Sequence, residues 1–163
     1  TFPQVSTLDL YVSSALVTWV TEVVILFIYL MLVRLWGYTF VLHDPITLLI
    51  ALVGIGTFGF GCGLTLAAFT LYLPVIEKLV PMVMRIMFFT SGVFFSPSQM
   101  AHVFGGAIMW NPVTNYIELL RGVFIFRSPA EAVKTDYITW LTFGVVAFGL
   151  LLERYVRAKQ EYV

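Results

Sequence analysis

Apolar residues in this chain form long unbroken runs and do not alternate with polar ones. The runs are separated by short clusters of Pro, Gly and charged residues. They cover residues 10–36, 46–73, 79–95 and 137–152. A helical bilayer crossing needs about 20 apolar residues, whereas a membrane barrel would show alternation. Since lipid requires every backbone polar group to be satisfied internally, continuous runs predict an all-α integral membrane protein with four transmembrane helices.

The segment 97–126, between the third and fourth runs, is apolar but interrupted. Pro97, the Gly105-Gly106 pair and Asn111-Pro112 break it into arms at 97–110 and 112–126. As helices, these arms would each be roughly 20 Å long, which is shorter than the hydrocarbon core. The third run would end and the fourth would begin on the same side, so an even number of half-crossings is required. We therefore expect a re-entrant helical hairpin before the last span.

The second arm has a polar stripe, because Thr114, Glu118 and Arg121 are spaced four and three residues apart. Asn111 is a favourable helix cap and Pro112 suits the first helical position. A polar stripe on a half-buried helix needs water or protein opposite it. We predict that these five residues form an outer gate at the mouth of a pathway. The alternative is a helix that lies flat on the membrane.

The composition agrees with a membrane protein: 60% of the residues are hydrophobic and 11% are charged. Soluble domains average about 25% charged residues. The net charge is zero and no basic run occurs, which argues against a nucleic-acid partner. Cys62 is the one cysteine, so a disulfide framework is excluded.

No catalytic or metal-binding pattern is present in the sequence. His43 and His102 lack the spacing of a metal site, and Walker A, GxSxG and HExxH motifs are absent. We therefore predict a chain that is not an enzyme and that holds no cofactor, metal or catalytic residue. ATP hydrolysis by this chain alone is excluded on the same grounds.

The basic residues give an orientation through the positive-inside rule. One side of the membrane would hold Lys78, Arg85 and the tail residues Arg154, Arg157 and Lys159. The other side would hold Arg34, Arg127 and Lys134. We expect both chain ends, and the turn between the second and third runs, to be cytoplasmic.

Two features inside the runs have two interpretations each. Glu22 lies near the middle of the first run, where a carboxylate is costly; it either lines a polar path or makes an interhelical hydrogen bond. The second run contains GIGTFGFGCG, residues 54–63. Its glycines indicate close helix contact or, alternatively, a hinge.

The chain resembles a known family over essentially its whole length, and three stretches carry the resemblance. FPQV is followed by a polar gap, LDL and a long span; SGVFFS closes a Met- and Phe-rich span; and WNPVTNYIELLRGVF precedes a last span with a basic tail. Together they resemble the ABC-2-type permeases that export capsular polysaccharide and O-antigen. The chain departs from the family pattern early in the first span, where Ser14 and Thr18 replace a basic and an acidic residue.

The resemblance implies that residues 1–163 form one ABC-2-type transmembrane domain, the last four of six spans. It implies a bacterial inner-membrane location, a homodimer of permeases and a separate ATP-binding subunit that holds ATP and Mg. A cytoplasmic coupling helix would precede FPQV, so Phe2, Pro3, Gln4, Val5 and Asp9 are candidate contacts to the ATPase. The segment after SGVFFS would correspond to the outer gate helices.

A polysaccharide path would be lined by aromatic and small polar side chains, because sugars offer hydroxyls and apolar ring faces. The candidates are Trp19, Glu22, Trp110 and Tyr116. Three alternatives remain: an ABC-2 permease for teichoic acid, a drug or a lipid; a membrane-embedded enzyme acting on lipid-linked sugar; and a scaffold that transports nothing.

Overall fold

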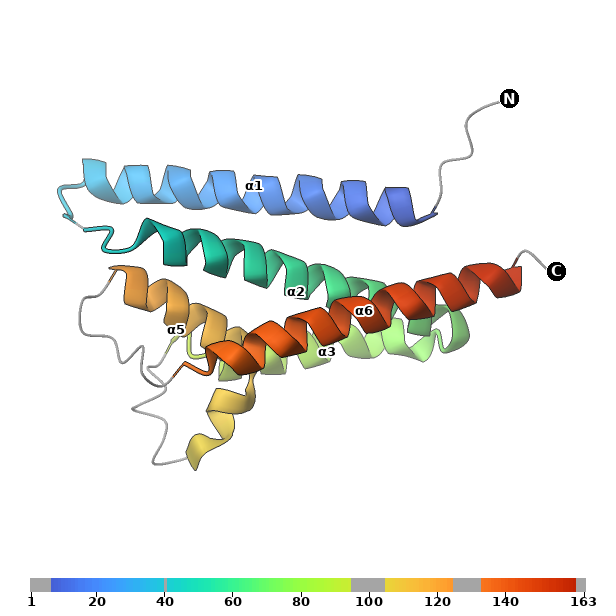
Figure 1. The fold of residues 1–163 in the computed structure, drawn as a ribbon. Coiled ribbons are helices and arrows are strands. Elements are labelled where there is room, and N and C mark those ends of the chain that lie inside the picture. The colour runs from blue at the N-terminus through green and yellow to red at the C-terminus, as the bar shows by residue number, and fades with distance from the viewer. Residues whose placement is uncertain (1–6, 40, 95–104, 125–132, 161–163) are drawn as a thin grey trace, which may run out of the picture. The chain divides into compact units, whose positions relative to one another are not determined.

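A computed structural model describes residues 7–39, 41–94, 105–124 and 133–160, and every regular element within these ranges is helical (Figure 1). This confirms the all-α prediction. The elements are α1 (Thr7–Leu35), α2 (Pro45–Tyr72), α3 (Val75–Thr90), the 3-10 helix η1 (Gly105–Trp110), α5 (Pro112–Phe124) and α6 (Thr135–Gln160). The chain divides into two compact units, Thr1–Val41 and Leu42–Val163. The first contains α1, and the second contains the other helices.

Within the described ranges, three helices are long and apolar enough to cross a membrane. They are Leu8–Leu35, Pro45–Tyr72 and Thr135–Ala158, which correspond to the first, second and fourth predicted runs. The third run, expected at 79–95, is represented by α3, a helix of 16 residues that ends at Thr90. The chain turns at Ser91-Gly92, where Gly92 has a φ of 79°. The count of four spans is therefore not confirmed by helix length.

The start of α2 is fixed by Asp44 and Pro45. The Asp44 carboxylate accepts hydrogen bonds from the backbone N–H groups of Ile46 (3.0 Å) and Thr47 (3.2 Å), and from the Thr47 hydroxyl (2.6 Å). These are bonds to a helix N-cap, and Pro45 needs no N–H partner at the first helical position. The Thr47 hydroxyl, followed by the Thr47 N–H, lowers the pKa of Asp44 because both stabilise the charged form.

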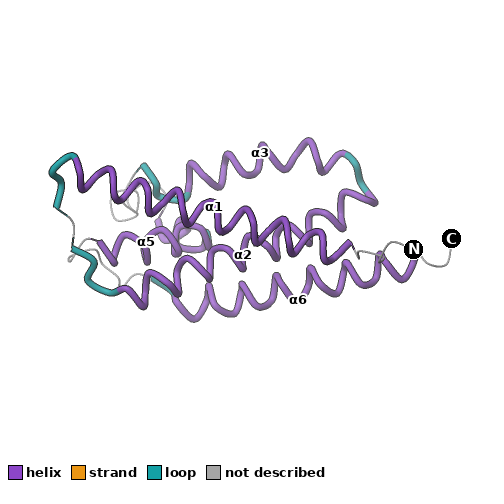
Figure 2. The backbone as a smooth tube through the Cα atoms, turned by 90° about the horizontal axis from the view of Figure 1, so that it is seen from above, coloured by secondary structure: helices purple, strands orange, loops and turns teal. Residues whose placement is uncertain are grey.

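Helices α2 and α6 form the main contact of the second unit and lie side by side in both the ribbon and the backbone tube (Figures 1 and 2). A Cβ built on Gly61 would lie 2.8 Å from the Val146 backbone nitrogen, and one on Gly149 would lie 2.9 Å from Leu64 Cβ. The contacts advance in the same direction along both helices, so α2 and α6 are parallel. Glycines at this crossing let the two backbones approach closely.

Helix α5 packs against both α2 and α6, and Phe58, Tyr116 and Ile138 form the core between the three helices. The Val123 carbonyl at the end of α5 accepts a hydrogen bond from the His43 N–H (3.2 Å), just before α2 begins. The other end of α5 lies further along α2, because Tyr116 contacts Gly54. Helix α5 is therefore antiparallel to α2.

Candidate functional site

The C-terminal end of α3 leaves backbone carbonyls without partners inside the helix, as every helix end does. Because α3 stops at Thr90 and the chain turns at Ser91-Gly92, these carbonyls need other partners. The Thr90 hydroxyl reaches the carbonyls of Ile86 and Met87, and Ser91 reaches that of Phe88. Side chains from α5 supply further donors. Within the apolar part of a membrane no water is available to provide them. Their partners therefore determine where the end of α3 is held.

Polar side chains of α5 and its cap donate to these carbonyls. Asn111 Nδ2 donates to the Met87 carbonyl (3.3 Å) and to Thr90 Oγ1 (3.1 Å), while Thr114 Oγ1 donates to the Thr90 carbonyl (3.1 Å). Arg121 donates to the Gly92 carbonyl at 2.7 Å. We call this set of contacts the α3–α5 joint. It comprises Met87, Thr90 and Gly92 from the end of α3, and Asn111, Thr114 and Arg121 from α5.

An ion pair stands beside the joint, between Arg121 and Glu118 one turn apart on α5. The Glu118 side chain is only 4% exposed and that of Arg121 is 22% exposed. Removing one partner from a buried pair leaves an uncompensated charge and is strongly destabilising. Arg121 also places its positive charge at the C-terminal end of α3, where the helix dipole favours a cation.

Asn111 has a second role as the cap of α5. Its Oδ1 accepts the Val113 N–H at 3.0 Å while its Nδ2 reaches α3. The sequence prediction of Asn111 as a cap and Pro112 as the first helical residue agrees with this geometry. The predicted stripe does share one face, and within the described residues that face lies against the end of α3.

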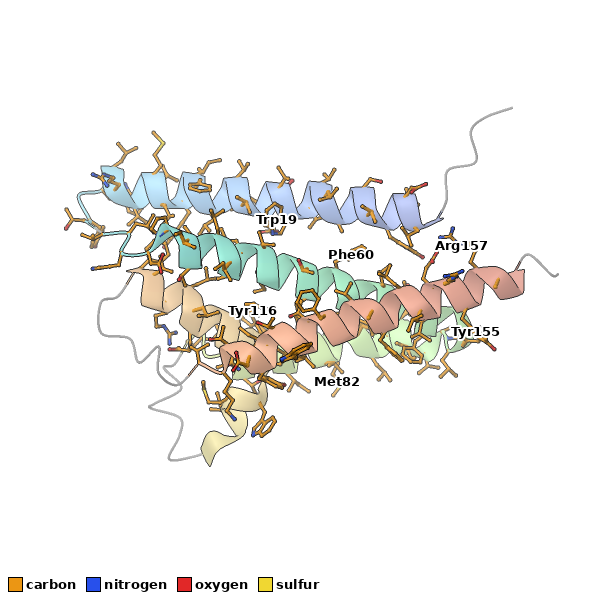
Figure 3. All side chains as sticks on the ribbon, in the orientation of Figure 1. Trp19, Phe60, Met82, Tyr116, Tyr155 and Arg157 are labelled. Carbon is orange, nitrogen blue, oxygen red and sulfur yellow. The ribbon has the colours of Figure 1, made fainter. Side chains whose placement is uncertain are left out.

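The opposite side of α5 is held by Tyr116, which is 3% exposed. A Cβ on Gly54 would lie 2.7 Å from Tyr116 Cε1, so the ring rests on the bare backbone of α2. The Tyr116 hydroxyl lies 2.7 Å from Thr142 Oγ1. Since the Thr142 hydroxyl donates to the Ile138 carbonyl (2.7 Å), Tyr116 is the donor. Figure 3 labels Tyr116 at this position between the helices.

Asn115, a residue that the sequence analysis did not single out, connects the turn before α5 to the start of α6. Its side-chain amide donates to the Met109 carbonyl (2.8 Å) and the Asn111 carbonyl (3.1 Å), and its oxygen accepts the Lys134 N–H (3.0 Å). It is fully buried. Two asparagines in WNPVTN, four residues apart, were the available signal, because they share one helical face.

Trp110 is 62% exposed at the end of η1. Its carbonyl accepts the Tyr137 hydroxyl (2.8 Å), its ring meets the Tyr137 ring edge-on, and the Lys134 ammonium lies 4.3 Å from the indole centroid. This arrangement fixes an aromatic ring at the start of α6. Of the predicted path residues in the second unit, Trp110 is therefore exposed and Tyr116 is enclosed by protein.

Comparison with known proteins gives the family. The model of the ABC-2 type transporter family matches residues 1–125, which is more than half of the chain. The chain belongs to the ABC-2 type transporter family. This confirms the resemblance and identifies a multi-pass membrane subunit of a transporter, in agreement with the prediction that the chain is not an enzyme.

Two Escherichia coli proteins, both named polysialic acid transport protein KpsM, are similar to this ABC-2 chain. One is 24% identical over 145 residues, covering 88% of the chain and 50% of that protein. The other is 21% identical over 150 residues, covering 92% of the chain and 58% of that protein. The chain thus spans about half the length of the curated relatives it matches. No solved structure matches it significantly.

The remaining predicted residues of this ABC-2 chain belong to the first unit. Trp19 is partly buried and Glu22 is exposed, three positions apart on α1. Asp9 lies in the first turn of α1, where its carbonyl accepts the Ser13 hydroxyl. Phe2, Pro3, Gln4 and Val5 lie outside the described residues, as does most of the first arm, 97–110. No group of three potential metal ligands occurs among the residues that were described.

Proposed function

We propose that this chain is the permease part of an ATP-driven exporter that moves polysaccharide across the bacterial inner membrane. The observation that carries the proposal is the similarity of 88% or more of the chain to two polysialic acid transport proteins of the same family. The identities of 24% and 21% leave the particular polymer open.

The parallel arrangement of α2 and α6 supports four crossings. If both helices cross the membrane in the same direction, the chain between them must cross back an odd number of times. Helix α3 follows α2 after the Leu73-Pro74 turn and leads toward α5, so it can provide that crossing. A crossing by 16 residues, roughly 24 Å of helix, requires local thinning of the bilayer or the added length of the residues after Thr90.

The position of α5 supports a re-entrant outer gate. Its first residues contact the end of α3 through Asn111, and its last turn contacts the start of α2 through Val123. Under the four-crossing topology, the Val123 contact lies at the outer side, and the Asn111 contact lies up to one α5 length, roughly 20 Å, deeper in the membrane. Helix α5 is then the arm of the re-entrant hairpin that returns to the outer side, and its polar stripe holds the gate against α3.

The transport path in this proposal is lined by Trp19, Glu22, Trp110 and Tyr116. Tyr116 is enclosed by α2 and α6, so it can meet cargo only after α5 moves away from Gly54 and Thr142. The described structure therefore supports a closed gate, and opening would break the Tyr116 contacts with Gly54 and Thr142 together with other α5 contacts such as that of Asn115 with Lys134. Trp110 is accessible without such movement.

The partners follow from the same proposal. A second permease copy completes the path, and a separate ATP-binding subunit holds ATP and Mg. That subunit contacts residues Phe2 to Val5 and Asp9 on the cytoplasmic side, where both chain ends lie. Membrane lipid surrounds the apolar helices.

Export in a deletion strain tests this function. The full-length gene is removed and replaced by wild-type or Arg121→Ala forms, and surface polysaccharide and membrane-inserted protein are both measured. Wild type should restore surface polymer. Arg121→Ala should insert but export less, because the Gly92 contact and the charge partner of Glu118 are lost.

If the deletion strain no longer exports teichoic acid, a drug or a lipid, and its surface polysaccharide is unchanged, the cargo is that other compound. Turnover of lipid-linked sugar by purified protein without an ATPase would favour the enzyme alternative. Wild-type export by Arg121→Ala would contradict the gate role of the stripe.

A further inference from the structure

The α3–α5 joint has a geometry that passes movement from one helix to the other. We propose that Asn111, Thr114 and Arg121 are positioning residues that make α5 follow α3. Displacement of the turn between α2 and α3 would then move the outer helix. This inference rests on the proposed function, because it assumes that the ATP-binding subunit drives the cytoplasmic end of the permease.

The first argument is the contrast between α3 and its neighbours. None of the residues of α3 is buried, whereas α2 contributes Ala51, Phe58 and Leu64 to the interior. A helix with no buried side chain is held chiefly by its ends. One end is the short connection at Leu73-Pro74, and the other end is the joint.

The second argument is the character of the contacts. Two α5 side chains and the Asn111 cap reach three carbonyls near the end of α3, those of Met87, Thr90 and Gly92. Hydrogen bonds are directional, and an apolar medium supplies no water to replace a lost donor. The Met87 carbonyl would keep the Thr90 hydroxyl as a donor. Sliding α3 past α5 would break all three, so the pair moves together more readily than it separates.

The third argument is that α5 makes the contacts that would have to break when the proposed gate opens. Its other attachments include the Tyr116 hydroxyl bond to Thr142, the Asn115 bond to the Lys134 N–H and the backbone bond to His43. A pull through Asn111 and Thr114 acts at the beginning of α5, close to Tyr116, and a pull through Arg121 acts at its last turn. Helix α3 is roughly 24 Å long, so the signal would cover most of the hydrocarbon thickness in one element.

The chain offers variants that separate this role from helix capping. Asn111→Ser keeps an oxygen that can cap α5 but loses the amide that reaches Met87 and Thr90. Thr114→Val keeps the shape and loses the hydroxyl. The control is Thr139→Val on α6, which makes the same chemical change where the exposed hydroxyl bonds only its own helix at Thr135.

The experiment uses the full-length permease with its ATP-binding subunit in lipid nanodiscs. Hydrogen–deuterium exchange of residues 75–90 and 112–124 is compared with and without trapped nucleotide. In wild type and Thr139→Val, trapped nucleotide should change the exchange rate of both segments. In the Asn111→Ser, Thr114→Val double variant, α3 should still respond and α5 should not. ATP should still be hydrolysed, but export should be lost. The Thr114→Val single variant, a milder change, provides the same comparison if the double variant does not assemble.

An α5 response that is unchanged in the joint variants would overturn the inference, as would a wild-type α5 that ignores nucleotide. If the responses are as expected but no polysaccharide is exported by wild type, the proposed cargo is wrong and the joint stands.

Discussion

At the residue scale, two details of the neighbouring helices position α5: a missing Cβ atom on α2 and a hydroxyl oxygen on α6. Gly54 lacks the Cβ that would collide with Tyr116, and Thr142 offers the oxygen that receives the Tyr116 hydroxyl. The ring cannot retreat from α2 without losing that bond. The position of α5 therefore depends on the absence of a methyl group at residue 54.

Gly54→Ala should destabilise the protein because its new Cβ would lie 2.7 Å from Tyr116 Cε1. Overpacking of this kind costs about 1–3 kcal/mol. The measurement is the thermal unfolding midpoint of the purified full-length permease. Gly59→Ala on the same helix is the control, because nothing lies within 4 Å of its added Cβ. Equal midpoints for the two variants would contradict the contact.

Asp44 gives a second prediction at this scale, concerning pH. Its pKa is lowered in the folded protein by the Thr47 bonds. A depressed folded pKa contributes stability above the unfolded pKa of about 4, and this contribution is lost as the pH falls through the folded pKa.

Asp44→Asn keeps a cap oxygen that does not titrate. As the pH falls below about 4, the unfolding midpoint of wild type should therefore decrease more steeply than that of this variant. Unfolding midpoints between neutral and acidic pH provide the measurement, and parallel curves would show that the Asp44 cap is not the titrating group.

At the element scale, the parallel pair α2 and α6 is the support on which α5 rests. Gly61 and Gly149 bring the two backbones together, so side chains cannot be added at the crossing without separating the helices. The contact atoms opposite Gly61 include the Val146 backbone nitrogen and Cα, which cannot rotate away as a side chain can.

Gly61→Ala should therefore weaken the α2–α6 pair, whereas Gly63→Ala should be tolerated because its Cβ meets nothing within 4 Å. We expect a loss of about 1–3 kcal/mol for Gly61→Ala. Unfolding of both purified variants in detergent would measure it. A Gly63→Ala variant as unstable as Gly61→Ala would mean that another surface covers α2.

The sequence predicted these elements better than their packing. Continuous apolar runs indicate helices, but they have no preferred face, so the contacts between runs were not predictable. The glycines of residues 54–63 indicated close contact, yet they cover more than one face of α2. Only the structure distinguishes Gly54 and Gly61, which are in contact, from Gly59 and Gly63.

The polar stripe of α5 was predicted as a face because spacing alone determines it. Its partner at the end of α3 was not predictable, since backbone carbonyls leave no trace in a sequence. The Ser91-Gly92 pair was the available signal for that end, because glycine commonly follows a helix C-terminus in the left-handed region. The gate and path roles of the predicted residues stay predictions.

At the whole-molecule scale, the parallel direction of α2 and α6 constrains every topology. If both helices cross the membrane, an odd number of crossings separates them, and α3 is the described helix that can supply one. Residues before α2 and after α3 should then face one side, whereas the α2–α3 turn and the end of α6 should face the other. Orientation is a separate question, for which the basic residues near Lys78 and Arg154 predict that their side is cytoplasmic.

Cysteine accessibility tests both statements in one experiment. Single cysteines replace Leu42, Glu77, Val93 or Arg154, all exposed, in full-length permease with Cys62→Ala. A membrane-impermeant maleimide should label the cysteines introduced at Leu42 and Val93 in intact spheroplasts. It should label those introduced at Glu77 and Arg154 only after lysis. The reverse pattern would invert the orientation but keep the four crossings. Labelling of Glu77 and Val93 from the same side would show that α3 does not cross, and α5 could then not be a re-entrant helix of the proposed kind.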